Sequence, residues 1–161
     1  MQATHSPADY LKQAYLGEVA GEASLRALSS LLPEQSVQLN LLAEVEAATA
    51  KMLEAVLLEP VPAAEREQAA AQGLAGLDGL ADADWPQLAA SILPIAERAL
   101  VRFQNAHQYA PKDLLPVYQM VTAHEQALVD CLQAEAGGTD GLSFLRSYLG
   151  RVAQFSQSAA P

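Results

Sequence analysis

The sequence has little cysteine, few basic residues and no long apolar run, and each shortage excludes a class of protein. Cys131 is the single cysteine in 161 residues, so no disulfide can form within the chain, which fits a reducing cytoplasm. Nine Lys and Arg stand against 19 Asp and Glu, giving a net charge of −10. Without a basic cluster, nucleic acid and anionic membrane surfaces are poor partners.

Membrane and secretion signals are also missing from the sequence. No apolar run reaches the ~18 residues that a bilayer-spanning helix needs. The first residues lack the basic region followed by an apolar core that marks a signal peptide. We therefore expect a cytoplasmic protein that does not contact membranes.

The residues that are abundant favour a single helical domain. Hydrophobic residues make up 51% of the chain and charged residues 17%, and alanine and leucine, both good helix formers, dominate. Every long apolar pattern fits a period of 3.6 residues and none fits a period of two. The sequence thus predicts one all-α domain over residues 1–161.

Capping residues and prolines divide this domain into four long helices and a shorter fifth. Ser6 and Asp84 are good N-caps, each followed by a proline within the first turn, and Asp113 is a third predicted cap. Short connections predict that the first and second helices, and the third and fourth, are antiparallel neighbours. The Pro- and Gly-containing stretch 59–84 predicts a long surface crossover with a short helix at 63–75. The predicted helices cover about residues 7–32, 33–58, 84–109, 113–135 and 142–155, and the last is expected to be a cover.

Glutamates interrupt the apolar stripes of three predicted helices. Glu18, Glu46 and Glu125 each replace a leucine-type residue on its own stripe, so the three should converge in the interior. Glu97 flanks the stripe of the third long helix, and His124 is turned about 100° from Glu125. Like charges so close cannot all stay ionised, so the cluster requires a metal ion or protons. Gly17 and Gly21, on either side of Glu18, predict the close approach of another helix.

This layout resembles the ferritin-like superfamily, which includes ferritins, rubrerythrins and di-iron hydroxylases. The resemblance implies a ferritin-like four-helix bundle with a long crossover between helices 2 and 3, and two iron or manganese ions as cofactors. It also implies oxidation of a small molecule with dioxygen, with His124 as a ligand or a neighbouring group. The glutamates that match the family's ligands are Glu18 in YLGEVAGE, Glu46 in EVEAAT, Glu97 in IAERAL and Glu125 in TAHEQAL.

The sequence departs from this family at two ligand positions. Thr49 and Leu128 stand where the family's Glu-x-x-His motifs place histidines, and imidazole nitrogens favour iron and manganese. The alternative is a vestigial cluster that shares protons or bonds Tyr15, Tyr118 or Thr49. The protein would then be a metal-free, non-enzymatic bundle that binds a small apolar molecule or a protein partner.

A second apolar line on the first two helices predicts self-association. Exposed apolar faces wider than one stripe are typical of subunit interfaces. We therefore expect a homodimer through these two helices. The line consists of Leu16, Val19, Leu41, Val45 and Met52.

Overall fold

The computed structural model describes residues 6–75, 77–80 and 82–158, and this part of the chain is helical without any strand. The predicted all-α class is confirmed. No helix in the described ranges is both long and apolar enough to cross a membrane. The α-helices are α1 (Pro7–Leu31), α2 (Ser36–Glu54), α3 (Ala63–Leu74), α4 (Trp85–Ala106), α5 (Leu115–Ala136) and α6 (Leu142–Ser158), and the 3-10 turns are η1 (Pro33–Gln35), η2 (Leu77–Leu80) and η3 (His107–Tyr109).

The helix starts show how far local sequence fixes the boundaries. Ser6 caps α1 by accepting a hydrogen bond from the Asp9 backbone N–H at 3.1 Å, and Asp84 caps α4 in the same way. The predicted cap at Asp113 is wrong, because α5 begins at Leu115. A cap at Asp113 would place Pro116 at the third helical position, and proline lacks the N–H that such a cap binds.

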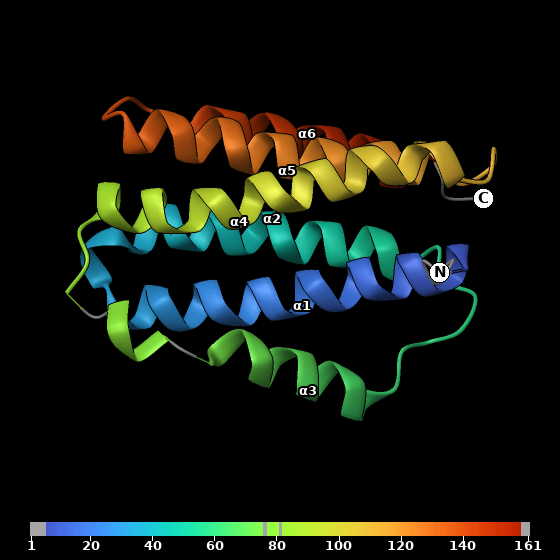
Figure 1. Cartoon of the computed structure of the whole chain (residues 1–161), viewed down its shortest axis with the longest axis horizontal. Coiled ribbons are helices and arrows are strands. Elements are labelled where there is room, and N and C mark those ends of the chain that lie inside the picture. Colours follow the sequence, from blue (N-terminus) through green and yellow to red (C-terminus); the bar gives the residue numbers. More distant parts are fainter. Residues whose placement is uncertain (1–5, 76, 81, 159–161) are drawn as a thin grey trace.

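The helices form two antiparallel pairs joined by a long crossover. Helix α1 packs along α2, and α4 packs along α5. The crossover carries the chain back along the length of the bundle, so that α2 and α4 run in the same direction (Figure 1). The predicted crossover helix is present as α3, which lies against α1. Residues 76 and 81 of this crossover lie outside the described residues.

Helix α3 is fixed on α1 by a close backbone approach and by an ion pair. A Cβ added at Gly73 would collide with the backbone carbonyl of Ala20, so glycine allows the two helices to touch there. Lys12 Nζ lies 2.7 Å from Glu65 Oε2 and joins the other end of α3 to α1. These two contacts hold α3 beside α1 and leave space along one flank.

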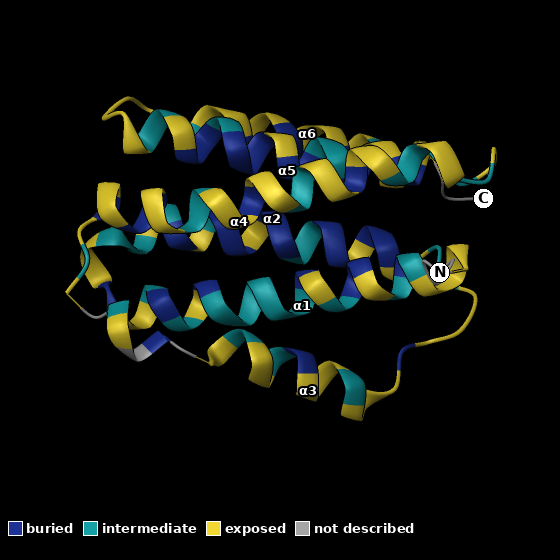
Figure 2. Cartoon of the chain, viewed as in Figure 1, coloured by how far each residue is buried: buried dark blue, intermediate teal, exposed yellow. Residues whose placement is uncertain are grey.

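Helix α6 is more than the cover that was expected. It packs against both α2 and α5 and buries Leu145, Tyr148 and Val152. Because α2 contacts α1, α5 and α6, its apolar surface is used within the chain, and burial is concentrated along α2 and α5 (Figure 2).

This burial changes the basis of the predicted homodimer. Val45 and Met52 are buried in the core and offer no surface to a second copy of the chain. Leu16, Val19 and Leu41 are half-buried, and the homodimer remains a prediction that rests on these three residues.

Candidate metal centre

Four ionisable side chains from three helices meet in the bundle interior. Glu18 comes from α1, Glu46 from α2, and His124 and Glu125 from α5. All four are buried, with relative exposures between 1% and 8%. The expected convergence of Glu18, Glu46 and Glu125 is therefore observed.

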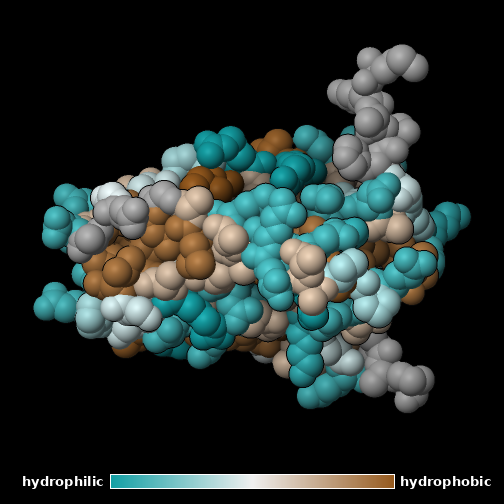
Figure 3. All heavy atoms as spheres, turned by 90° about the horizontal axis from the view of Figure 1, so that it is seen from below, coloured by the Kyte–Doolittle hydropathy of each residue, from teal (hydrophilic) through white to brown (hydrophobic). Residues whose placement is uncertain are grey.

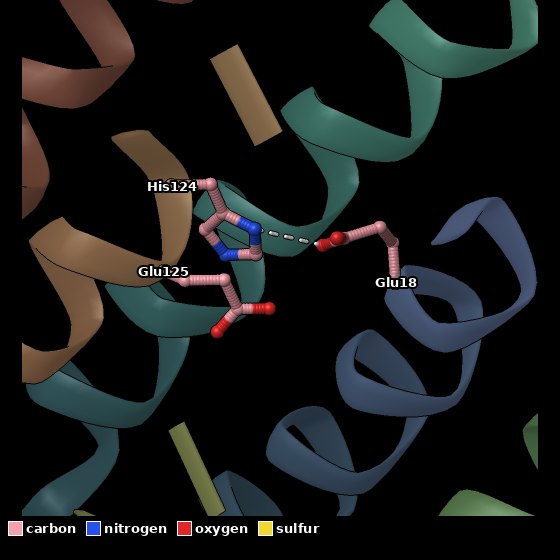
Figure 4. Close-up of side chains that lie close together, drawn as sticks. All are labelled: Glu18, His124 and Glu125. Atoms are coloured by element: carbon pink, nitrogen blue, oxygen red, sulfur yellow. Dashed lines mark ion pairs between the residues drawn. The ribbon is translucent and has the colours of Figure 1, made fainter. Parts of the chain in front are cut away.

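The imidazole of His124 lies between carboxylates of two different helices. Its Nδ1 is 3.2 Å from Glu18 Oε2, and its Nε2 is 3.7 Å from Glu46 Oε1. Figure 4 shows the Glu125 carboxyl beside the ring, on the same helix. One ligand atom each from Glu18, His124 and Glu125 lie within 4.8 Å of one another, so this group can hold a metal ion.

Buried polar atoms in this group lack hydrogen-bond partners. Glu18 Oε2 and both ring nitrogens of His124 are inaccessible to solvent, and none of them makes a hydrogen bond in the described structure. Burying polar groups without a hydrogen bond costs roughly 1–3 kcal/mol each, and the great majority of buried polar atoms make one. A neutral imidazole also carries one unshared lone pair, so the group is suited to a cation.

His124 is buried although its side chain leaves α5 about 100° around the helix axis from that of Glu125. The reason is that α5 packs against α4 on one side and α6 on the other, which gives it a wide buried face. His124 at 1% and Glu125 at 7% exposure both fit within that face. His124 therefore lies at the centre of the cluster.

The fourth predicted ligand, Glu97, is not part of the cluster. Its side chain is exposed and accepts a hydrogen bond from Gln133 at 3.4 Å. Three of the buried positions of α4, Ala89, Ala96 and Phe103, follow one another at intervals of seven residues, and Glu97 is turned about 100° from that line. Helix α4 thus supplies no carboxylate to the cluster.

The two glycines of α1 play different roles. A Cβ at Gly21 would lie 2.8 Å from Glu46 Cδ, so Gly21 makes room for the Glu46 carboxyl rather than for a helix backbone. A Cβ at Gly17 would meet nothing within 4 Å. The expected close helix approach is therefore wrong at Gly17, which borders open space.

The Thr49 hydroxyl is hydrogen-bonded to a residue of α6. It donates to the Val45 carbonyl at 2.9 Å and lies 2.8 Å from the Tyr148 hydroxyl. Because Thr49 gives its one proton to Val45, Tyr148 donates to Thr49. The Tyr148 ring is centred 5.5 Å from the His124 ring. The sequence pattern did not predict this contact, because it depends on how α6 docks.

Burial dominates the protonation of the cluster. It raises the pKa of Glu18 to about 8, an effect partly offset by hydrogen bonding with Glu46 and by the charge of Arg102. Burial also raises the pKa of Glu125 to about 7, against the opposing charge of His124. The pKa of Glu46 is raised well above its usual value by burial and by the Glu18 charge. Without a cation, these carboxyls hold protons near neutral pH.

The metal-free protein should lose stability as pH rises, relative to a Glu18→Gln variant. The pKa of Glu18 is raised from 4.5 to about 8 on folding, so the folded state binds the extra proton. That stabilisation is complete below pH 4.5 and is lost as pH rises through 8. Thermal melts in chelator between pH 5.5 and 8.5 should show the wild type falling relative to the variant. Parallel curves would contradict the assignment.

No protein-family model, curated protein or solved structure matches the chain. Fold and site alone therefore define its class, an all-helical bundle with a buried carboxylate–imidazole group that can hold a metal ion.

Proposed function

We propose that this chain is a ferritin-like bundle that binds a redox-active transition-metal ion and acts as an oxidoreductase on a small molecule. The observation that carries the proposal is the buried His124 ring, whose nitrogens face Glu18 and Glu46 and make no hydrogen bond to any residue that the structure describes. Carboxylates suit hard cations, and an added imidazole shifts the preference from calcium and magnesium towards iron and manganese.

The ligand set supports one ion rather than two. Glu18, Glu125 and His124 would hold the ion, with Glu46 as a further carboxylate beside the ring. A second ion would need further inward ligands, but of the positions expected to supply them Glu97 is exposed and Thr49 is bonded to Tyr148. When bound, iron or manganese would supply one-electron chemistry to a bound substrate.

The ferritin-like assignment is supported by the path of the chain. The antiparallel pairs α1–α2 and α4–α5, joined by a crossover as long as the bundle (Figure 1), correspond to the topology that the sequence resemblance implies. The glutamates of α1, α2 and α5 lie in its interior.

A metal-free bundle that binds an apolar molecule or a protein partner is the second candidate. It is favoured by the raised pKa values of Glu18 and Glu125, about 8 and about 7. Protonated carboxyls can donate hydrogen bonds to their neighbours without any ion. The two candidates differ in whether the protein retains metal.

Metal retention separates these candidates. Protein stripped with a chelator, incubated with Mn²⁺ or anaerobic Fe²⁺ and desalted should keep about one ion per chain by elemental analysis. Glu18→Gln should lose the ion, because it removes a negatively charged ligand. Glu97→Gln, on the surface, is the matched control and should keep it. A wild-type protein that retains no metal would leave the metal-free bundle as the better account.

A further inference from the structure

A cleft outside the carboxylate cluster is lined by residues of α1, α3 and α4. Its volume is about 720 Å³, within the range of pockets that hold small organic molecules. Helix α1 contributes Tyr10, Ala14 and Gly17, and α4 contributes Arg102 and Phe103. On the face that carries α3, hydrophilic side chains cover the middle of the molecule and hydrophobic ones gather towards one end (Figure 3).

Arg102 determines the charge preference of this cleft. Its guanidinium lies 4.6 Å from the centre of the Phe103 ring, and it forms no ion pair among the residues that the structure describes. Glu65, which also lines the cleft, is already paired with Lys12 at 2.7 Å. Arg102 is therefore available to an incoming anion, and its planar fork matches a carboxylate.

The remaining wall combines the polar side chains of Gln13, Gln68 and Gln72 with an apolar part that suits an apolar body. Ala14 and Phe103 are buried core residues at the edge of the cleft. Gly17 adds open space, because a side chain there would meet nothing within 4 Å. A glycine inside a helix costs about 1 kcal/mol relative to alanine, so its presence is explained by the volume it leaves free.

The cleft backs onto the carboxylate cluster. Glu18 directly follows Gly17 on α1, and the charge of Arg102 lowers the pKa of both Glu18 and Glu125. The Tyr10 hydroxyl is buried at this border and has no hydrogen-bond partner in the described structure. A molecule in the cleft would therefore lie against the same stretch of α1 that carries Glu18.

We propose that the cleft binds a small amphipathic carboxylate, with its carboxylate on Arg102 and its apolar body along Ala14, Gly17 and Phe103. The cleft residues are distinct from the proposed metal ligands, so binding is expected of the metal-free protein as well. Binding of the carboxylate can therefore be tested independently of metal binding.

Calorimetric titration of chelator-treated protein with three eight-carbon probes tests the charge preference. Octanoate should bind, while octan-1-ol should bind about tenfold to a hundredfold more weakly and octylammonium more weakly still. Arg102→Gln should reduce octanoate affinity to that of octan-1-ol. Arg98→Gln, on the same helix but exposed and outside the cleft, should leave it unchanged. Equal binding of octanoate and octan-1-ol, or an unaffected Arg102→Gln variant, would overturn the proposal.

A second variant tests whether the ligand binds in this cleft or elsewhere on the protein. Gly17→Leu should fill the open space and abolish octanoate binding while the helix gains propensity. Gly150→Leu is the matched control, because Gly150 is also helical with nothing within 4 Å of an added Cβ. Octanoate binding that survives Gly17→Leu, or no binding to wild type up to about 1 mM, would refute the site.

Discussion

Replacing Glu125 by leucine is expected to stabilise the metal-free protein and to abolish its response to metal. The carboxyl is 7% exposed, and burial raises its pKa to about 7. At pH 7.5 most of it is therefore ionised, and burying this charge lowers the stability of the folded protein. Exchanging buried charges for apolar side chains of similar volume often stabilises by about 1–4 kcal/mol. For a chain of this size, each kcal/mol raises the melting temperature by about 2–4 °C.

The same substitution removes a proposed ligand. Metal at 100 times its Kd should stabilise the wild type by about 2.7 kcal/mol, whereas Glu125→Leu should show no such gain. Glu44→Leu is the matched control, because Glu44 is an exposed glutamate on α2 and should change neither property. A destabilised Glu125→Leu variant that still responds to Mn²⁺ would contradict both the burial cost and the ligand role.

Metal affinity is expected to rise steeply with pH. Binding must displace protons from Glu18 and Glu125, whose pKa values are about 8 and about 7, because a ligating carboxylate is deprotonated. Between pH 6 and pH 8, loss of two protons should strengthen Mn²⁺ binding by about two to three orders of magnitude. Calorimetric titrations in buffers of different ionisation enthalpy would give both the affinity and the number of protons released.

Two variants test whether this pH dependence of metal affinity comes from the cluster. Glu97→Gln should keep the wild-type slope, because Glu97 is exposed. Glu18→Gln, in any binding that remains, should release one proton fewer. An affinity that is flat from pH 6 to pH 8 would show that the carboxyls are already ionised without metal.

The helix pattern and the buried glutamates could be predicted because both follow from local periodicity. A glutamate on an apolar stripe must face the interior when its helix packs, and Glu18, Glu46 and Glu125 do so. The capped starts at Ser6 and Asp84 are equally local, since each cap needs only the next three residues.

The remaining features depend on how whole helices dock, which periodicity does not specify. The burial of His124 requires α5 to lie between α4 and α6, and the Tyr148–Thr49 contact requires α6 to reach α2. Glu97 flanks its stripe, so a small rotation of α4 decides whether it faces the cluster or the solvent. The Arg102 cleft exists only because α3 lies beside α1.

The central claim is that His124 binds a metal ion directly, and pulsed electron paramagnetic resonance of Mn²⁺-loaded protein tests it. The chain has three histidines, and His107 Nε2 lies 2.7 Å from Thr122 Oγ1, outside the cluster. The expected result is coupling of one imidazole nitrogen to the manganese in the wild type and in His107→Gln, and its loss in His124→Gln. Loaded wild-type protein without nitrogen coupling, or coupling that persists in His124→Gln, would contradict the account.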